Sequence, residues 1–380
     1  MDLSKLKRED VKVVDDDLAK VLAETINDYE TRTGKTLQPA HIERLLINTY
    51  AYREALVRQA VNEAYRQQHP RFATGLMLDL CGDDVNTPRL QASAARCTLR
   101  FAADLSGQQT VYVAAGTLVA AGEVMFETTE AGNLTATKRT LDLQAVCTQP
   151  GETGNGWLVG QINQLVNQLS AGIHVTVGNI NVPSGGAEIE QDDAYRERIM
   201  LAFESFSVAG PAGAYKYFAM SVSPVITDVY VDNPVDALGA PIGGRVDVTV
   251  LTRTGLPSSE LLAQVQAAIS GDRRRPLCDS PMVVAPEAVN YAVNAQLVLL
   301  SGTNPDQAIA EAKAAWAVYE AERRQKLGID IVPLEIQTVL KVAGVYNVVL
   351  NNMPLRVVKP NQWARCTSVT ITAALEQFDG

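Results

Sequence analysis

The hydrophobic period of the sequence changes at about residue 91, and this change limits the possible folds more than any other feature. Before it, apolar residues recur at the spacing of amphipathic helices. After it, they alternate over short stretches separated by glycine, as strands do. We therefore predict an α+β, multidomain chain. It would have an N-terminal helical region (1–90), a small all-β domain (91–180) and mixed α/β regions, namely a central α+β domain (181–302) and a C-terminal α+β region (303–380).

Two helices are predicted in the N-terminal region. The first has an apolar stripe that begins at Leu18, with the acidic residues 15–17 in its first turn and Gly34 as its stop. The second starts behind Pro39, a residue suited to the first helical position. Its stripe begins at Ile42. The two stripes could pack on each other or on a neighbouring subunit, and the sequence does not choose between these.

Further elements follow from the same two periods. Helices are expected over 195–206, after Gly210-Pro211, and over 258–270, 305–326 and 333–343. Strands are expected over 97–101, 111–114, 141–146, 225–232, 246–250, 291–299, 345–350 and 366–373.

Composition narrows the class of partner. The chain has 33 basic and 43 acidic residues and a net charge of −10, which argues against nucleic-acid binding. No apolar run reaches the roughly 20 residues of a membrane helix, and the first residues lack the apolar core of a secretory signal. We expect a soluble protein without a membrane partner. Its five scattered cysteines are expected to be buried or semi-buried thiols in a reducing compartment.

Catalytic motifs are not evident. The three histidines, His41, His69 and His174, have no metal-ligand spacing, and no G-x-S-x-G elbow occurs. The glycines between Gly154 and Gly160 are one residue off the dinucleotide-binding pattern and indicate a turn instead. We expect no catalytic, cofactor-binding or metal-binding residues, no cofactor, and no enzyme activity.

Two charged clusters have alternative interpretations. The carboxylates between Glu188 and Asp193 could hold a cation, but acidic residues at a helix start have a sufficient cause in the helix dipole. The run from Arg273 to Arg275 suits either a solvated turn or an interface with an acidic partner.

One segment carries a family resemblance. Residues 185–199 combine a double glycine, acidic residues and a Tyr-Arg-x-Arg-Ile helix start, and this signature segment resembles that of the baseplate J family of contractile phage tails. Residues 210–219 resemble the family's second helix. Residues 113–122 resemble its P-A-G-T turn, with Ala115 where proline is usual. The resemblance extends over roughly residues 90 to 350.

The resemblance implies an interface or structural motif. Gly185-Gly186 would form a turn that only glycine enters without strain. Arg196 and Arg198 would brace that turn or a neighbouring subunit through carboxylates, or would simply lie on an exposed helix face with i,i+4 pairs. The predicted motif residues are Gly185, Gly186, Glu188, Glu190, Tyr195, Arg196 and Arg198.

The family also implies a function. Such a protein is a structural wedge of the virion's tail baseplate, assembled in the host cytoplasm around the central hub. Its partners would be other wedge proteins, copies of itself, the hub and tail fibre attachment proteins, and its rearrangement would release sheath contraction. Two alternatives remain. One is the same fold in a phage-derived injection device or bacteriocin. The other is a glycan-binding or glycan-hydrolysing tail protein, which would need paired carboxylates in an aromatic cleft, although aromatics are only 6% of the chain.

Overall fold

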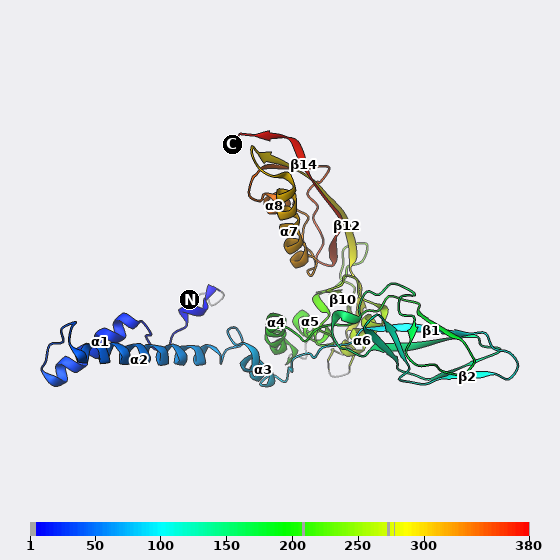
Figure 1. Cartoon of the computed structure of the whole chain (residues 1–380), viewed down its shortest axis with the longest axis horizontal. Coiled ribbons are helices and arrows are strands. Elements are labelled where there is room, and N and C mark those ends of the chain that lie inside the picture. The colour runs from blue at the N-terminus through cyan, green and yellow to red at the C-terminus, as the bar shows by residue number, and fades with distance from the viewer. Residues whose placement is uncertain (1–4, 207–209, 272–273, 277, 380) are drawn as a thin grey trace. The chain divides into compact units, whose positions relative to one another are not determined.

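The computed structural model describes residues 5–206, 210–271, 274–276 and 278–379. They form two compact units. The first contains the chain up to Arg89 together with Gln191–Met200, and the second contains Leu90–Glu190 and the chain from Leu201 onward. The fold class is the predicted one, with N-terminal helices, an all-β domain and then mixed α/β regions (Figure 1).

The first unit is helical. It comprises a 3-10 turn (Arg8–Asp10), α1 (Leu18–Thr33), α2 (Ile42–Arg66), α3 (Gly75–Asp83) and most of α4 (Asp192–Ala202).

Local chemistry sets the ends of α1 and α2. The Asp17 carboxylate accepts hydrogen bonds from the N–H groups of Ala19 and Lys20, and Gly34 ends α1 at φ 68°. The predicted start of α2 was wrong, because Pro39 lies in the preceding turn and His41 is the N-cap.

A small core joins α1 to α2. Val21, Ala51 and Ala55 are buried together, and the alanines let the two helix backbones approach closely. Asn62 of α2 is fully buried. Its side chain accepts from the N–H groups of Val13 and Val14 and donates to the Val14 carbonyl, which fixes the segment before α1.

The β domain contains β1 (Arg96–Ala103), β2 (Thr110–Val113), β3 (Leu118–Ala121), β4 (Val124–Thr128), β5 (Gly132–Thr135), β6 (Thr140–Cys147), β7 (Gln164–Leu165) and β8 (Val175–Asn179). Six of these strands form one antiparallel sheet in the order β7-β3-β4-β6-β1-β8, and β2 pairs with β5. Alternate residues of β1 and β6 point inward, and Leu99, Phe101 and Phe126 are among the fully buried core residues.

A mixed sheet follows in the central region. β10 (Arg245–Thr252) pairs antiparallel with β9 (Ile226–Asp232) and parallel with β11 (Ser280–Val284). Helix α5 (Ala212–Met220) packs on β9, and α6 (Ser259–Ile269) packs beside β11. The helix predicted over 195–206 ends earlier, because α4 gives way to a 3-10 turn at Phe203–Phe206.

A second mixed sheet forms the C-terminal region. β12 (Glu287–Leu300) lies between antiparallel β13 (Val345–Leu350) and parallel β14 (Gln362–Phe378). Helices α7 (Pro305–Arg323) and α8 (Pro333–Leu340) pack on this sheet, and their core includes Trp316 and Leu297. Within the described residues, every helix is too short or too polar to cross a lipid bilayer.

Candidate functional site

The signature segment is divided between the two units. Its first part, up to Glu190, belongs to the second unit, and Gln191 to Met200 belong to the first. We therefore describe the contacts of each part within its own unit.

The two glycines meet different requirements. Gly185 has φ +86°, a conformation that glycine adopts without strain. Gly186 is limited by space, since a Cβ atom there would lie 2.4 Å from the Gly151 carbonyl oxygen. Its N–H donates to Asn155 Oδ1 over 3.0 Å, and Asn155 Nδ2 donates back to the Gly186 carbonyl over 2.8 Å. The turn around Asn155 is therefore held against the glycine pair.

Both glutamates bind backbone donors of the β domain. Glu188 Oε1 accepts from the Glu152 N–H over 3.1 Å, next to Gly151 at φ +113°. Glu190 is 6% exposed, and its carboxylate accepts from the Leu90 N–H while its own N–H donates to the Leu90 carbonyl. These contacts join residues more than 30 positions apart and close the β domain at its chain ends.

Tyr195 is the centre of the second part of the segment. It is fully buried, and its hydroxyl donates to the Thr87 carbonyl over 2.8 Å. The guanidinium carbons of Arg89 and Arg198 lie 4.5 and 5.4 Å from the ring centroid, within the range of a cation–π contact. Gly82 of α3 packs so closely that a Cβ there would overlap the tyrosine hydroxyl.

The two signature arginines brace loops of the first unit. Arg198 is only 2% exposed and donates to the Pro88 carbonyl over 2.7 Å, so the exposed-face interpretation does not apply to it. Arg196 donates to the carbonyls of Pro70 and Ala73 and also pairs with Asp193. These carbonyl partners lie more than 100 residues earlier in the chain, and nothing in the local sequence could have pointed to them.

Asp192 connects α4 to α3. One carboxylate oxygen accepts from the Gly75 N–H at the start of α3, over 2.9 Å, and the other binds Arg89 over 2.7 Å. The Gly75 hydrogen bond, followed by the Arg89 guanidinium, lowers the pKa of the Asp192 carboxyl below its ordinary value. The carboxylates proposed for a cation thus each bind donors of the chain itself. Among the described residues, no group of three or more His, Cys, Asp or Glu side chains is arranged to hold a metal.

The arginine run lies beside the end of α6. Arg273 is outside the described residues. Arg274 donates to the Ala268 carbonyl, and Arg275 donates to the carbonyls of Ser270 and Asp279. The two described arginines therefore satisfy acceptors near the helix C-terminus.

The thiols differ in exposure. Cys81, Cys97 and Cys147 are buried and Cys366 is half-buried, but Cys278 is exposed, so the expectation of uniformly buried or semi-buried thiols was wrong for it.

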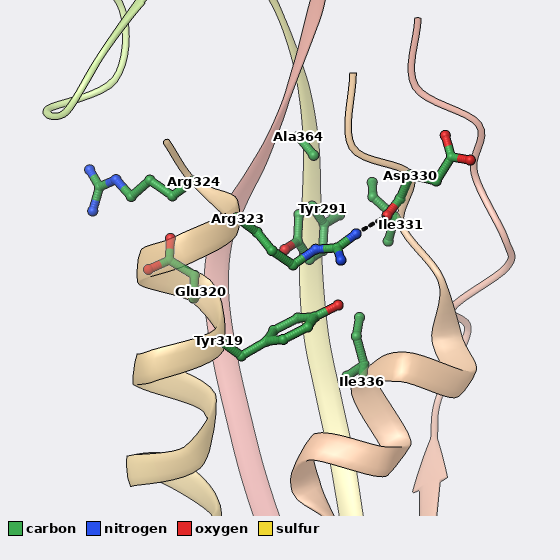
Figure 2. Close-up of a pocket in the computed structure, with 9 residues that line it drawn as sticks. All are labelled: Tyr291, Tyr319, Glu320, Arg323, Arg324, Asp330, Ile331, Ile336 and Ala364. Carbon is green, nitrogen blue, oxygen red and sulfur yellow. Dashed lines mark hydrogen bonds between the residues drawn. The ribbon is translucent and has the colours of Figure 1, made fainter. Parts of the chain in front are cut away.

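The C-terminal region contains a small polar pocket between α7, α8 and β12. Arg323 points into it and donates to the carbonyl of Asp330 (Figure 2). Its guanidinium also binds Glu335 over 2.7 Å, and Glu335 accepts from the Tyr319 hydroxyl over 3.0 Å. Burial raises the pKa of Tyr319 to about 12. The cavity volume is about 10 Å³, which suits a single water molecule and not a substrate.

A series of exposed apolar side chains lies on α2. The predicted stripe does not face α1, because Ala51 and Ala55 on another face make that contact. Ile42, for example, is 74% exposed. The large apolar side chains exposed along α2 are Ile42, Leu45, Leu46, Tyr50, Tyr52, Leu56, Val57, Val61 and Tyr65. We call this set the α2 apolar surface. Exposed apolar side chains that gather along one helix are typical of protein interfaces.

Four family models match in sequence order and together cover most of the chain. They are the baseplate J-like N-terminal domain at residues 44–96, the barrel domain at 98–186, the central domain at 207–285 and the C-terminal domain at 291–372. The matched domains are thus those of a baseplate component, and residues 187–206, with most of the signature segment, lie between two of them. The chain belongs to the baseplate J family.

Individual relatives are similar over part or most of the chain. Baseplate protein J of Escherichia phage P2 is 36% identical over 171 residues, which are 44% of this chain and 54% of the phage protein. The cryo-EM structure of the anti-feeding prophage baseplate covers 91% of this chain and 90% of its matched chain at 12% identity, with a TM-score of 0.42. The family and the phage P2 relative support a structural role in a baseplate.

Proposed function

We propose that this chain is a wedge subunit of a contractile tail baseplate, which assembles around the central hub in the host cytoplasm and rearranges when the sheath contracts. Membership of the baseplate J family supports the baseplate part of this proposal. The α2 apolar surface supports the assembly part of the proposal. When a partner covers these exposed apolar side chains, their removal from water lowers the free energy.

The proposed partners follow from this surface and from the family. We expect α2 to pack against a helix of another wedge protein or of a second copy, and we expect contacts to the hub and to fibre attachment proteins elsewhere on the chain. The role is structural and not catalytic. Small domains with separate cores suit a subunit whose interfaces change during contraction.

Quantitative mass spectrometry of purified particles tests the role directly. This chain should be present at a low and fixed ratio to the tube and sheath proteins, consistent with a sixfold baseplate. Absence from finished particles would overturn the proposal and would leave an assembly factor as the alternative.

A paired substitution tests the surface. Leu45→Ser with Leu46→Ser should leave the fold intact, because both side chains are mostly exposed, but should reduce incorporation into tails. Leu334→Ser is the matched control, since Leu334 is a comparably exposed leucine in the C-terminal region. Equal incorporation of both variants would exclude α2 as an assembly surface.

A further inference from the structure

The turn around Asn155, which the signature glycines hold closed, contains a chemically reactive dipeptide. Asn155-Gly156 is the one place in the sequence where asparagine precedes glycine. A glycine after asparagine favours deamidation because it has no Cβ, so the side-chain amide carbon can approach its backbone nitrogen without a steric clash. Asn155 is half-buried and Gly156 is exposed. The turn therefore combines a reactive dipeptide with access to the water that the reaction consumes.

Deamidation at this dipeptide would be a ring closure followed by hydrolysis. The backbone nitrogen of Gly156 loses its proton to hydroxide and attacks Cγ of Asn155. A new C–N bond forms, the bond from Cγ to Nδ2 breaks, and ammonia leaves with a proton taken from water, which yields a cyclic imide. Water then opens the ring at either carbonyl and gives an aspartate or an isoaspartyl linkage at position 155. The net change is the gain of water and the loss of ammonia, without any oxidant or reductant.

The closed turn holds both reacting groups apart. The Asn155 amide is fixed from both sides, because Nδ2 donates to the Gly186 carbonyl over 2.8 Å and Oδ1 accepts from the Gly186 N–H over 3.0 Å. The attacking nitrogen is also occupied, since the Gly156 N–H donates to the Pro183 carbonyl over 3.1 Å. Ring closure therefore requires that the hydrogen bonds on both groups break at the same time.

The reaction product cannot rebuild this turn. An aspartate at position 155 has no N–H for the Gly186 carbonyl and places a carboxylate oxygen against it, which is repulsive. An isoaspartyl linkage lengthens the backbone in a turn with little spare room, where a Cβ on Gly186 would already meet Asn155 Oδ1 at 2.9 Å. Opening of the turn followed by deamidation is therefore a one-way path.

We propose that Asn155 is a deamidation site that the closed turn protects, so that deamidation marks each chain whose β domain stays open. A chain that closes promptly keeps the amide. A chain that remains open loses the donor that closure requires, and the modification thus limits the time in which it can still close. The proposal concerns the folding of this chain alone and is independent of its role in a baseplate.

Peptide mapping by mass spectrometry tests the protection. The full-length chain is kept at mildly alkaline pH in native buffer and in concentrated urea, and deamidation of Asn155 is followed in both. It should be at least about tenfold slower in native buffer, where only the small open population reacts. Asn133, which is exposed on β5 and precedes Leu134, is the internal control and should stay intact in both conditions. Equal rates at Asn155, or no reaction there in urea, would overturn the proposal.

A substitution tests whether the product can close. Asn155→Asp reproduces one product, and amide exchange at Gly156 and Gly186 should become about tenfold faster, because the turn is no longer held. Asn133→Asp is the matched control, since it adds the same charge to the same domain and should leave both amides unchanged. Wild-type exchange in Asn155→Asp would contradict the one-way path. The urea comparison uses the wild-type chain and decides the protection even if Asn155→Asp does not fold.

Discussion

The β domain and the α1–α2 pair differ in how many of their apolar side chains they bury. The β domain buries eighteen hydrophobic residues in one continuous core. The helix pair buries Val21, Ala51 and Ala55 together, while α2 leaves its large apolar residues in solvent. The β domain therefore has a large core of its own, whereas most of the large apolar side chains of α2 are not covered by the described residues of this chain. The size of the core therefore distinguishes the two regions, and under the proposed function the region with the small core is the one that assembles.

The largest expected difference in stability is between two leucine-to-alanine substitutions, one in each region. Leu99→Ala in β1 should destabilise the β domain by about 2 to 5 kcal/mol, because it leaves a cavity at a fully buried site. Leu46→Ala on α2 should change stability by less than about 0.5 kcal/mol. Denaturant unfolding, with hydrogen exchange as the probe of each region, measures the stability change of both variants. A similar loss at the two sites would mean that α2 is already covered in the isolated chain.

Gly186→Val should produce the next largest effect. The new side chain must displace the Gly151 carbonyl, and we expect a loss of about 3 kcal/mol together with failure to enter tails. Gly178→Ala serves as the control, because a Cβ there would make only an ordinary contact of 3.8 Å with Gly160. Normal stability and infectivity of the valine variant would show that the glycine pair does not close the β domain.

Asn62→Ala should have a smaller and more local effect. Removing the buried amide leaves the N–H groups of Val13 and Val14 without their acceptor and should cost about 1 to 3 kcal/mol. Faster amide exchange at these two residues, with unchanged exchange in the β domain, is the expected result. Faster exchange in both regions would contradict their independence.

The smallest effect concerns pH. The folded-state pKa of Asp192 is lowered, so its contribution to stability is present above the unfolded pKa and is lost as pH falls through the folded value, below about pH 4. Asp192→Asn should remove this dependence at a cost under about 1 kcal/mol at neutral pH. Asp193→Asn is the control, because the Asp193 side chain is 98% exposed. Identical acid unfolding of the two variants would refute the role of Asp192.

Local signals predicted the elements that local chemistry determines. Gly34 ends α1 as expected, because a left-handed glycine acts within one turn, whereas the placement of Asp15–Asp17 in the first turn was wrong, since Asp17 is the N-cap and α1 begins at Leu18. The four-residue strands β2, β3 and β5 are harder to predict from the sequence, since only β2 has a clear alternation of apolar and polar residues. Helix α3 was not predicted, because Leu76 and Leu80 stay exposed and give no one-sided stripe.

Long-range partners account for the rest. The double glycine and the Tyr-Arg-x-Arg run stand out in the sequence, but their contacts do not. Gly186 meets a carbonyl 35 residues earlier, and Arg198 meets one 110 residues earlier. For α2 the apolar spacing was visible, but which face contacts α1 depends on Ala51 and Ala55, whose small size carries no strong signal.

The division of the signature segment has a consequence for how the protein is made. The first unit takes in Gln191–Met200, which leave the ribosome about a hundred residues after Arg89. Until then, α3 lacks the carboxylate of Asp192 at its first turn, and Gly82 has no Tyr195 beside it. The whole β domain is therefore synthesised before the first unit can be completed. A fragment ending at residue 89 should be a poor substitute for that unit, whereas joining residues 191–200 to it through a short linker should restore it.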